Sequence, residues 1–92
     1  MLRIWGKLYK NNKIIKNEVS ISDVVKDYNE NLNDCITDLC YKMDIERPYW
    51  LKRNIDEYIR RNKTIFDENN FINKIDFDRF IIEELKEEKK KK

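Results

Sequence analysis

Residues 1–21, MLRIWGKLYKNNKIIKNEVSI, contain two runs of alternating side chains separated by the pair Asn11-Asn12. Asparagine tolerates the positive φ angles that both central residues of a type I′ turn require. The sequence therefore predicts a β-hairpin with Tyr9 opposite Ile14. Continued without a break, this register predicts an aliphatic face that lies against the core. That face consists of Leu2, Ile4, Leu8, Ile15, Val19 and Ile21.

The second face of the predicted hairpin mixes aromatic and cationic side chains and is the first candidate binding face. It consists of Arg3, Trp5, Lys7, Tyr9, Ile14 and Lys16. Rings that stack on bases, next to cations that neutralise phosphates, are typical of surfaces that bind single-stranded nucleic acid. Two other interpretations remain open. A second helix or residues 64–75 could cover the face, or it could contact a protein partner or a second copy.

Two helices are expected after the hairpin. Residues 22–43 carry apolar side chains at steps of three and four, and Ser22 is the expected N-cap. The second helix, residues 48–62, is expected to begin at Pro48, because proline suits the first position of a helix. Its predicted inner stripe is Leu51, Ile55 and Ile59.

The remaining residues complete an α+β fold. Residues 64–75 are expected to be irregular, with Phe66, Phe71 and Ile72 packed under the domain. Residues 76–85 fit either a helix capped by Asp76 or a strand along the hairpin edge. The strand is preferred, because a lone hairpin is marginal in water. The predicted architecture is thus an N-terminal antiparallel hairpin and a C-terminal strand, packed against one long helix and a second, shorter helix. Residues 1–85 form one domain, and 86–92 are expected to be a charged, mobile tail.

The composition offers little for catalysis. The chain has no histidine, and Gly6 is its one glycine, so histidine-based clusters and glycine-rich phosphate loops are excluded. Cys35 and Cys40 diverge on a helix and are expected to be buried, reduced thiols. We therefore expect no catalytic residue, no cofactor and no metal ion.

Charge and aromatic residues suggest a second surface. Charged residues make up 41% of the chain, yet the net charge is only +2, which gives no global footprint of a nucleic-acid binder. The expected second helix nevertheless gathers cations and rings that could extend a basic, aromatic surface, form core, or contact a second copy. These are Trp50, Arg53, Tyr58, Arg60 and Arg61.

Four stretches carry a resemblance to known sequences. They are Arg3-Ile4-Trp5-Gly6-Lys7, Leu39-Cys40-Tyr41-Lys42-Met43-Asp44-Ile45, Pro48-Tyr49-Trp50-Leu51 and Ile75-Asp76-Phe77-Asp78. In this order they resemble a group of small uncharacterised bacterial proteins. The resemblance implies a compact bacterial domain and no particular activity or ligand.

These observations favour a cytoplasmic, non-enzymatic interaction module that acts through a protein partner or self-association. Met1 and the residues after it lack the apolar core of a signal peptide, and no apolar run is long enough to cross a membrane. Nucleic-acid binding through the hairpin face is the first alternative, and an enzyme is the second.

Overall fold

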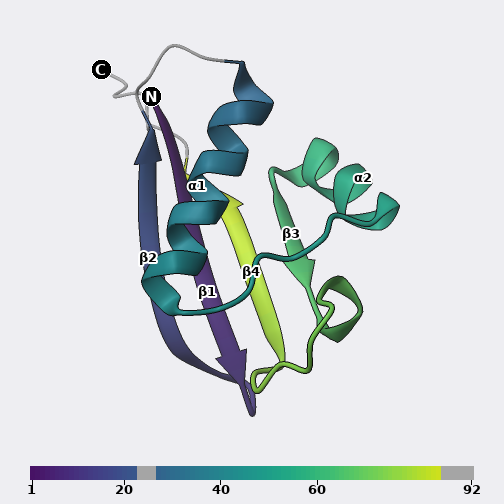
Figure 1. Ribbon diagram of the computed structural model, residues 1–92. Helices are drawn as coiled ribbons and strands as arrows, with labels where there is room; N and C mark the ends of the chain where they lie inside the picture. Colours follow the sequence, from purple (N-terminus) through teal and green to yellow (C-terminus); the bar gives the residue numbers. More distant parts are fainter. Residues whose placement is uncertain (23–26, 86–92) are drawn as a thin grey trace, which may run out of the picture.

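The computed structural model describes residues 1–22 and 27–85. Its centre is an antiparallel sheet of four strands in the order β2-β1-β4-β3, and both helices lie on the same side of this sheet (Figure 1). The strands are β1 (Leu2–Lys10), β2 (Lys13–Ser22), β3 (Lys63–Phe66) and β4 (Arg79–Glu84). The helices are α1 (Tyr28–Met43), α2 (Lys52–Arg61) and the short 3-10 helix η1 (Glu68–Asn70). The α+β class predicted from the sequence is confirmed.

The turn of the hairpin forms as predicted, but the register beyond it does not. Asn11 and Asn12 adopt positive φ angles of 55° and 65°, and Tyr9 lies opposite Ile14. The pairing then shifts by one residue, so that Leu8 lies opposite Lys16 and a bulge forms at Ile15. From there to the end of β2 every side chain lies on the face opposite to the predicted one.

This shift moves aliphatic residues of β2 out of the core and polar residues toward α1. Val19 and Ile21 now lie opposite Trp5 and Arg3 and are exposed, as is Ile15, so their predicted place in the core is wrong. On the helix side, the Ser20 hydroxyl donates to Asp38 Oδ2 at 2.7 Å. The Lys16 ammonium donates to the Met43 carbonyl at the end of α1, at 3.1 Å. The bulge is therefore stabilised by polar contacts, because both side chains find acceptors on α1.

The helix α1 begins later than predicted. Asp27 is its N-cap and accepts a hydrogen bond from the Asn29 amide. Ser22 ends β2, so its predicted role as N-cap is wrong, and the predicted helical residues 23–26 lie outside the described residues. At the other end Asp44 closes the helix in the left-handed conformation, with φ 58°.

The core lies between α1 and the helix-facing side of the sheet. α1 packs closely over Gly6, where an added Cβ would lie 3.0–3.1 Å from side-chain atoms of Phe80, Leu39 and Met43. A methyl group at this position would therefore require these side chains to shift by a few tenths of an ångström. The buried cluster includes Ile4, Leu8, Leu32, Leu39, Met43, Phe66, Phe80 and Ile82.

The C-terminal half adds two strands where the sequence predicted one. The strand expected within 76–85 is β4, which pairs with β1 through Leu8 and Phe80. The strand β3 pairs with β4, so the prediction that residues 64–75 are wholly irregular is wrong. Phe71 is buried as expected, whereas Ile72 is exposed. The predicted tail, 86–92, lies outside the described residues, and no helix among those described is long and apolar enough to cross a membrane.

Candidate functional site

The helix α2 faces the core with its polar side. It begins at Lys52, and Pro48 lies in the connector before it, so the predicted helix start is wrong. Its buried residues are Asn54 and Tyr58. The predicted inner stripe is exposed: Leu51 by 37%, Ile55 by 46% and Ile59 by 74%.

A hydrogen-bond network explains how a polar face can be buried here. The Asn54 amide donates to Thr64 Oγ1 at 2.9 Å and to the Ile65 carbonyl at 2.8 Å, both in β3. Its oxygen accepts from the Leu51 amide at 3.1 Å and from Asn70 Nδ2 at 2.8 Å. The side chain thereby uses both donor hydrogens and both acceptor positions. α2 is anchored to β3 and η1 through this network, which leaves its apolar side free.

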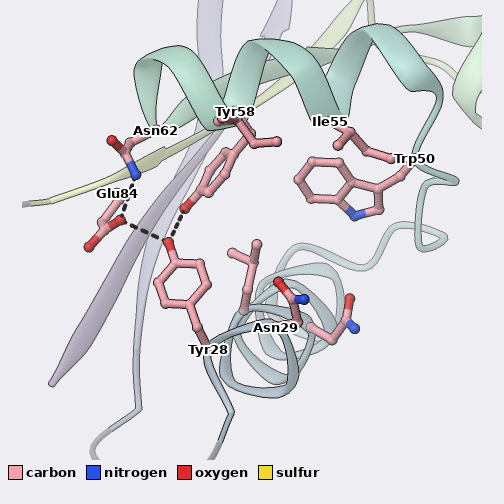
Figure 2. A pocket seen from close by; sticks show the side chains of 10 residues that line it. Tyr28, Asn29, Trp50, Ile55, Tyr58, Asn62 and Glu84 are labelled. Carbon is pink, nitrogen blue, oxygen red and sulfur yellow. Dashed lines mark hydrogen bonds between the residues drawn. The ribbon is translucent and has the colours of Figure 1, made fainter.

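That apolar side lines a groove of about 690 Å³ between α1 and α2 (Figure 2). One wall comes from the first turns of α1, the other from α2, and Trp50 stands at the α2 N-terminal end. The lining residues are Tyr28, Asn29, Leu32, Asn33, Trp50, Ile55, Tyr58, Ile59, Asn62 and Glu84. We call this the interhelical groove.

One end of the interhelical groove is polar. The Tyr28 hydroxyl donates to Glu84 Oε1 at 2.8 Å, and Asn62 Nδ2 donates to the same oxygen at 3.1 Å. Because the Tyr28 proton points to Glu84, Tyr58 is the donor in the 2.9 Å contact between the two tyrosine hydroxyls. Burial raises the pKa of both Tyr28 and Tyr58, so both remain protonated donors at neutral pH.

This end therefore presents a carboxylate with spare acceptor capacity. Both contacts to Glu84 use Oε1, and Oε2 has no hydrogen-bond partner among the described residues. A group that binds at this end of the groove gains most if it carries a positive charge or an N–H donor. No local pattern in the sequence indicates this cluster, because its members come from α1, the C-terminal end of α2 and β4.

The second surface is the side of the sheet that faces away from both helices, which we call the open face. No element among residues 1–22 and 27–85 covers it, so the interpretation that a helix or residues 64–75 bury it is wrong. Of the six residues predicted for the candidate face, all but Lys16 lie here. By strand register its members are Arg3, Trp5, Lys7, Tyr9, Ile14, Asn17, Val19, Ile21, Lys63, Ile65, Arg79, Ile81 and Glu83.

Cations lie against both aromatic rings of the open face. Lys7 Nζ is 4.0 Å from the centre of the Trp5 ring and 3.3 Å from Glu83 Oε1. The Arg79 guanidinium carbon is 4.8 Å from the centre of the Tyr9 ring. Each contact is within the range of a cation–π interaction. An unbroken register from the turn would place Lys16 opposite Lys7, whereas the shifted register places Asn17 there.

The residues of the predicted second surface do not gather on one surface. Trp50 and Tyr58 meet edge to face, with ring centres 5.7 Å apart, in the interhelical groove. Arg53 donates to Asp67 and Asn70, and Arg61 pairs with Glu57 on the same helix. Arg60 is exposed on the solvent side of α2. Two members thus belong to the groove, and the cations serve other contacts or solvent.

The thiols and carboxylates of the described residues form no reactive constellation. Cys35 and Cys40 are buried and free, as expected from the sequence. Burial raises the pKa of both, that of Cys40 to about 12, which disfavours the thiolate that a nucleophile needs. No group of three or more metal-ligating side chains occurs within residues 1–22 and 27–85.

Comparison with known proteins assigns neither a family nor a function to the chain. No protein-family model, no curated protein and no solved structure matches the chain. The geometry of the described residues offers the interhelical groove and the open face as candidate binding surfaces.

Proposed function

We propose that the protein is a non-enzymatic interaction module that binds an amphipathic helix of another protein in the interhelical groove. The observation that carries this proposal is the orientation of α2. A surface helix normally turns its apolar stripe to its own core. Here Asn54 occupies that position, and Ile55 and Ile59 are exposed beside the groove.

The chemistry of the groove favours a helix over an extended peptide. The floor and walls are mostly apolar, and apart from the polar end at Glu84 the polar side chains that line the groove are the amides of Asn29, Asn33 and Asn62. An extended peptide would leave its backbone groups unpaired in such a groove, whereas a helix satisfies its own. Apolar anchors one helical turn apart match the recognition mode in which a helix lies in a groove.

The negative charge of Glu84 at the polar end of the groove indicates which charge the bound helix should carry. Glu84 Oε2 has no partner among the described residues, and the neighbouring hydroxyls already donate toward the carboxylate. The bound helix is therefore expected to place a lysine or arginine at this end. A cation there adds a charge-assisted hydrogen bond at the edge of an apolar contact.

A second copy of the chain is a poorer occupant. α2 has ten residues, so its exposed stripe is about 15 Å long. Two such stripes packed together bury far less than the ~800 Å² per partner of a stable interface. Self-association through the groove would thus be weak, whereas a longer helix can also contact α1 and Trp50.

A designed peptide tests this proposal. The probe is an amphipathic helix with leucines at i, i+4 and i+7 and a lysine at one end, and the readout is the fluorescence of Trp50 in a Trp5→Phe background. We expect saturable binding that is lost in Ile59→Lys and kept in Ile72→Lys. The two isoleucines are matched controls, because they are 74% and 70% exposed and only Ile59 lines the groove.

Two further results decide the proposal. A peptide with glutamate in place of the lysine is expected to bind more weakly, because it faces Glu84. Equal binding by Ile59→Lys and Ile72→Lys would place the peptide elsewhere and contradict the proposal. Sedimentation of the free protein distinguishes the remaining case, since a stable dimer dissociated by Ile59→Lys would show that the occupant is a second copy.

A further inference from the structure

The open face lies on the other side of the sheet from the interhelical groove, and nothing in the proposed function uses it. It is apolar along β2, where Val19 and Ile21 are exposed, and cationic and aromatic along β1 and β4. Among the described strand residues that lie on this face, four are cations and one, Glu83, is a carboxylate. A sheet face that contacts only solvent does not require exposed aliphatic residues next to aromatic rings and cations.

The charge of this face selects its partner. Lys7 is paired with Glu83, whereas Arg3, Lys63 and Arg79 form no ion pair with another described residue. The Nε of Arg79 is buried and has no hydrogen-bond partner within the described chain. Because these three cations have no carboxylate partner in the described chain, an anionic ligand would supply one. Like charges would oppose the packing of a second copy against the same face.

The aromatic rings of Trp5 and Tyr9 define the spacing of a candidate binding site on the open face. Trp5 and Tyr9 lie on the same side of β1, four residues apart, which separates them by about 13 Å along the strand. Each has a cation against it, Lys7 at 4.0 Å and Arg79 at 4.8 Å. Rings on a sheet face with a cation over each of them are suited to bases and phosphates alternating along a strand, because the cation can contact a phosphate and the ring face that the cation leaves open can contact a base. An acidic protein surface would match the cations and leave the two rings without a specific partner.

We infer that the open face binds single-stranded nucleic acid, with Trp5 and Tyr9 stacking on bases and Arg3, Lys63 and Arg79 contacting phosphates. The apolar residues of β2 extend the platform beside Trp5. This site is independent of the interhelical groove, because the two surfaces lie on opposite sides of the sheet and share no residue.

Fluorescence anisotropy with a labelled single-stranded oligothymidylate tests the inference on the full chain. Three phosphate contacts predict that log K falls with log salt with a slope of about −2. Trp5→Ala is expected to weaken binding about tenfold or more, and Trp5→Phe, which keeps a ring, to change it by less than about threefold.

A pair of arginines provides the charge-matched control. Arg3→Ala and Arg60→Ala each remove one positive charge, but only Arg3 lies on the open face. We expect Arg3→Ala to weaken binding and to reduce the salt slope by about 0.7, and Arg60→Ala to do neither. Equal weakening by both variants would overturn the inference, as would absence of binding at low salt. Displacement of the oligonucleotide by polyglutamate at equal charge concentration would also overturn it, in favour of an acidic protein partner.

Discussion

The helices α1 and α2 lie on the same side of one sheet and meet it in opposite ways. α1 buries Leu32, Ile36, Leu39 and Met43 and leaves the carboxylates of Glu30 and Asp34 exposed. α2 buries Asn54 and leaves Ile55 and Ile59 exposed. An apolar stripe on a helix therefore predicts an apolar contact, but it does not indicate whether that contact is made within the chain or with a partner. A helix anchored by polar groups keeps its apolar stripe available to a partner.

The largest difference between the helices is expected from truncating one apolar residue in each. Leu39→Ala removes a side chain with no exposed surface and should lower the free energy of unfolding by about 3 kcal/mol. Ile55→Ala should lower it by less than about 1 kcal/mol, because nearly half of that side chain is already in water. Urea unfolding measures both. Equal losses would mean that α2 packs as α1 does.

The second effect concerns the polar anchor of α2. Asn54→Ala should cost about 2–3 kcal/mol, because the Leu51 amide and the Ile65 carbonyl lose buried partners. Asn33→Ala removes the same side chain from an exposed position on α1 and should change stability by less than about 0.5 kcal/mol. Similar values for the two asparagines would show that the network does not hold α2.

The third effect is a pH dependence at the contact between the helices. The pKa of Tyr58 is raised above 10.0 in the folded protein, chiefly by burial, so the unfolded chain loses this proton first as the pH rises. The stability linked to this group is therefore complete below about pH 10 and declines above it. Urea unfolding of the wild type and of Tyr58→Phe across this range should give a smaller decline in the variant. Parallel curves would exclude Tyr58 as a contributor.

The smallest effect on stability is expected at the tip of the exposed stripe. Ile59→Lys should change the free energy of unfolding by less than about 0.5 kcal/mol, because the side chain is mostly in water. A thermal melt checks this. A clear loss of stability would mean that Ile59 packs within the chain, and it would also remove the basis for using this variant as a binding test.

Local patterns in the sequence predicted the elements better than their faces. The C-terminal strand is preferred over a helix because a lone hairpin is marginal in water, whereas the Asn11-Asn12 turn and the two helices follow from residues that are neighbours in the chain. The bulge at Ile15 does not, because an unbroken register gives an equally regular aliphatic face. The bulge depends on hydrogen bonds that Ser20 and Lys16 donate to acceptors on α1, and these acceptors are far away in the sequence.

The interhelical groove could not be predicted from local patterns for the same reason. The spacing of Leu51, Ile55 and Ile59 is that of a buried stripe, and the partners that bury Asn54 instead are ten and sixteen residues away. The strand β3 is short and carries Thr64, whose burial depends on that asparagine. The open face was predicted in part, because alternation along β1 alone brings Arg3, Trp5, Lys7 and Tyr9 together.

Access of a soluble paramagnetic probe to the isoleucine methyl groups would show directly which side of α2 meets solvent. In the free protein the signals of Ile55 and Ile59 should broaden as strongly as that of exposed Ile72, while those of Ile4 and Ile82 remain sharp. Addition of the designed helix should then protect Ile55 and Ile59 and leave Ile72 unchanged. Protection of both α2 isoleucines in the free, monomeric protein would contradict the account, because α2 would then bury its apolar side within its own chain.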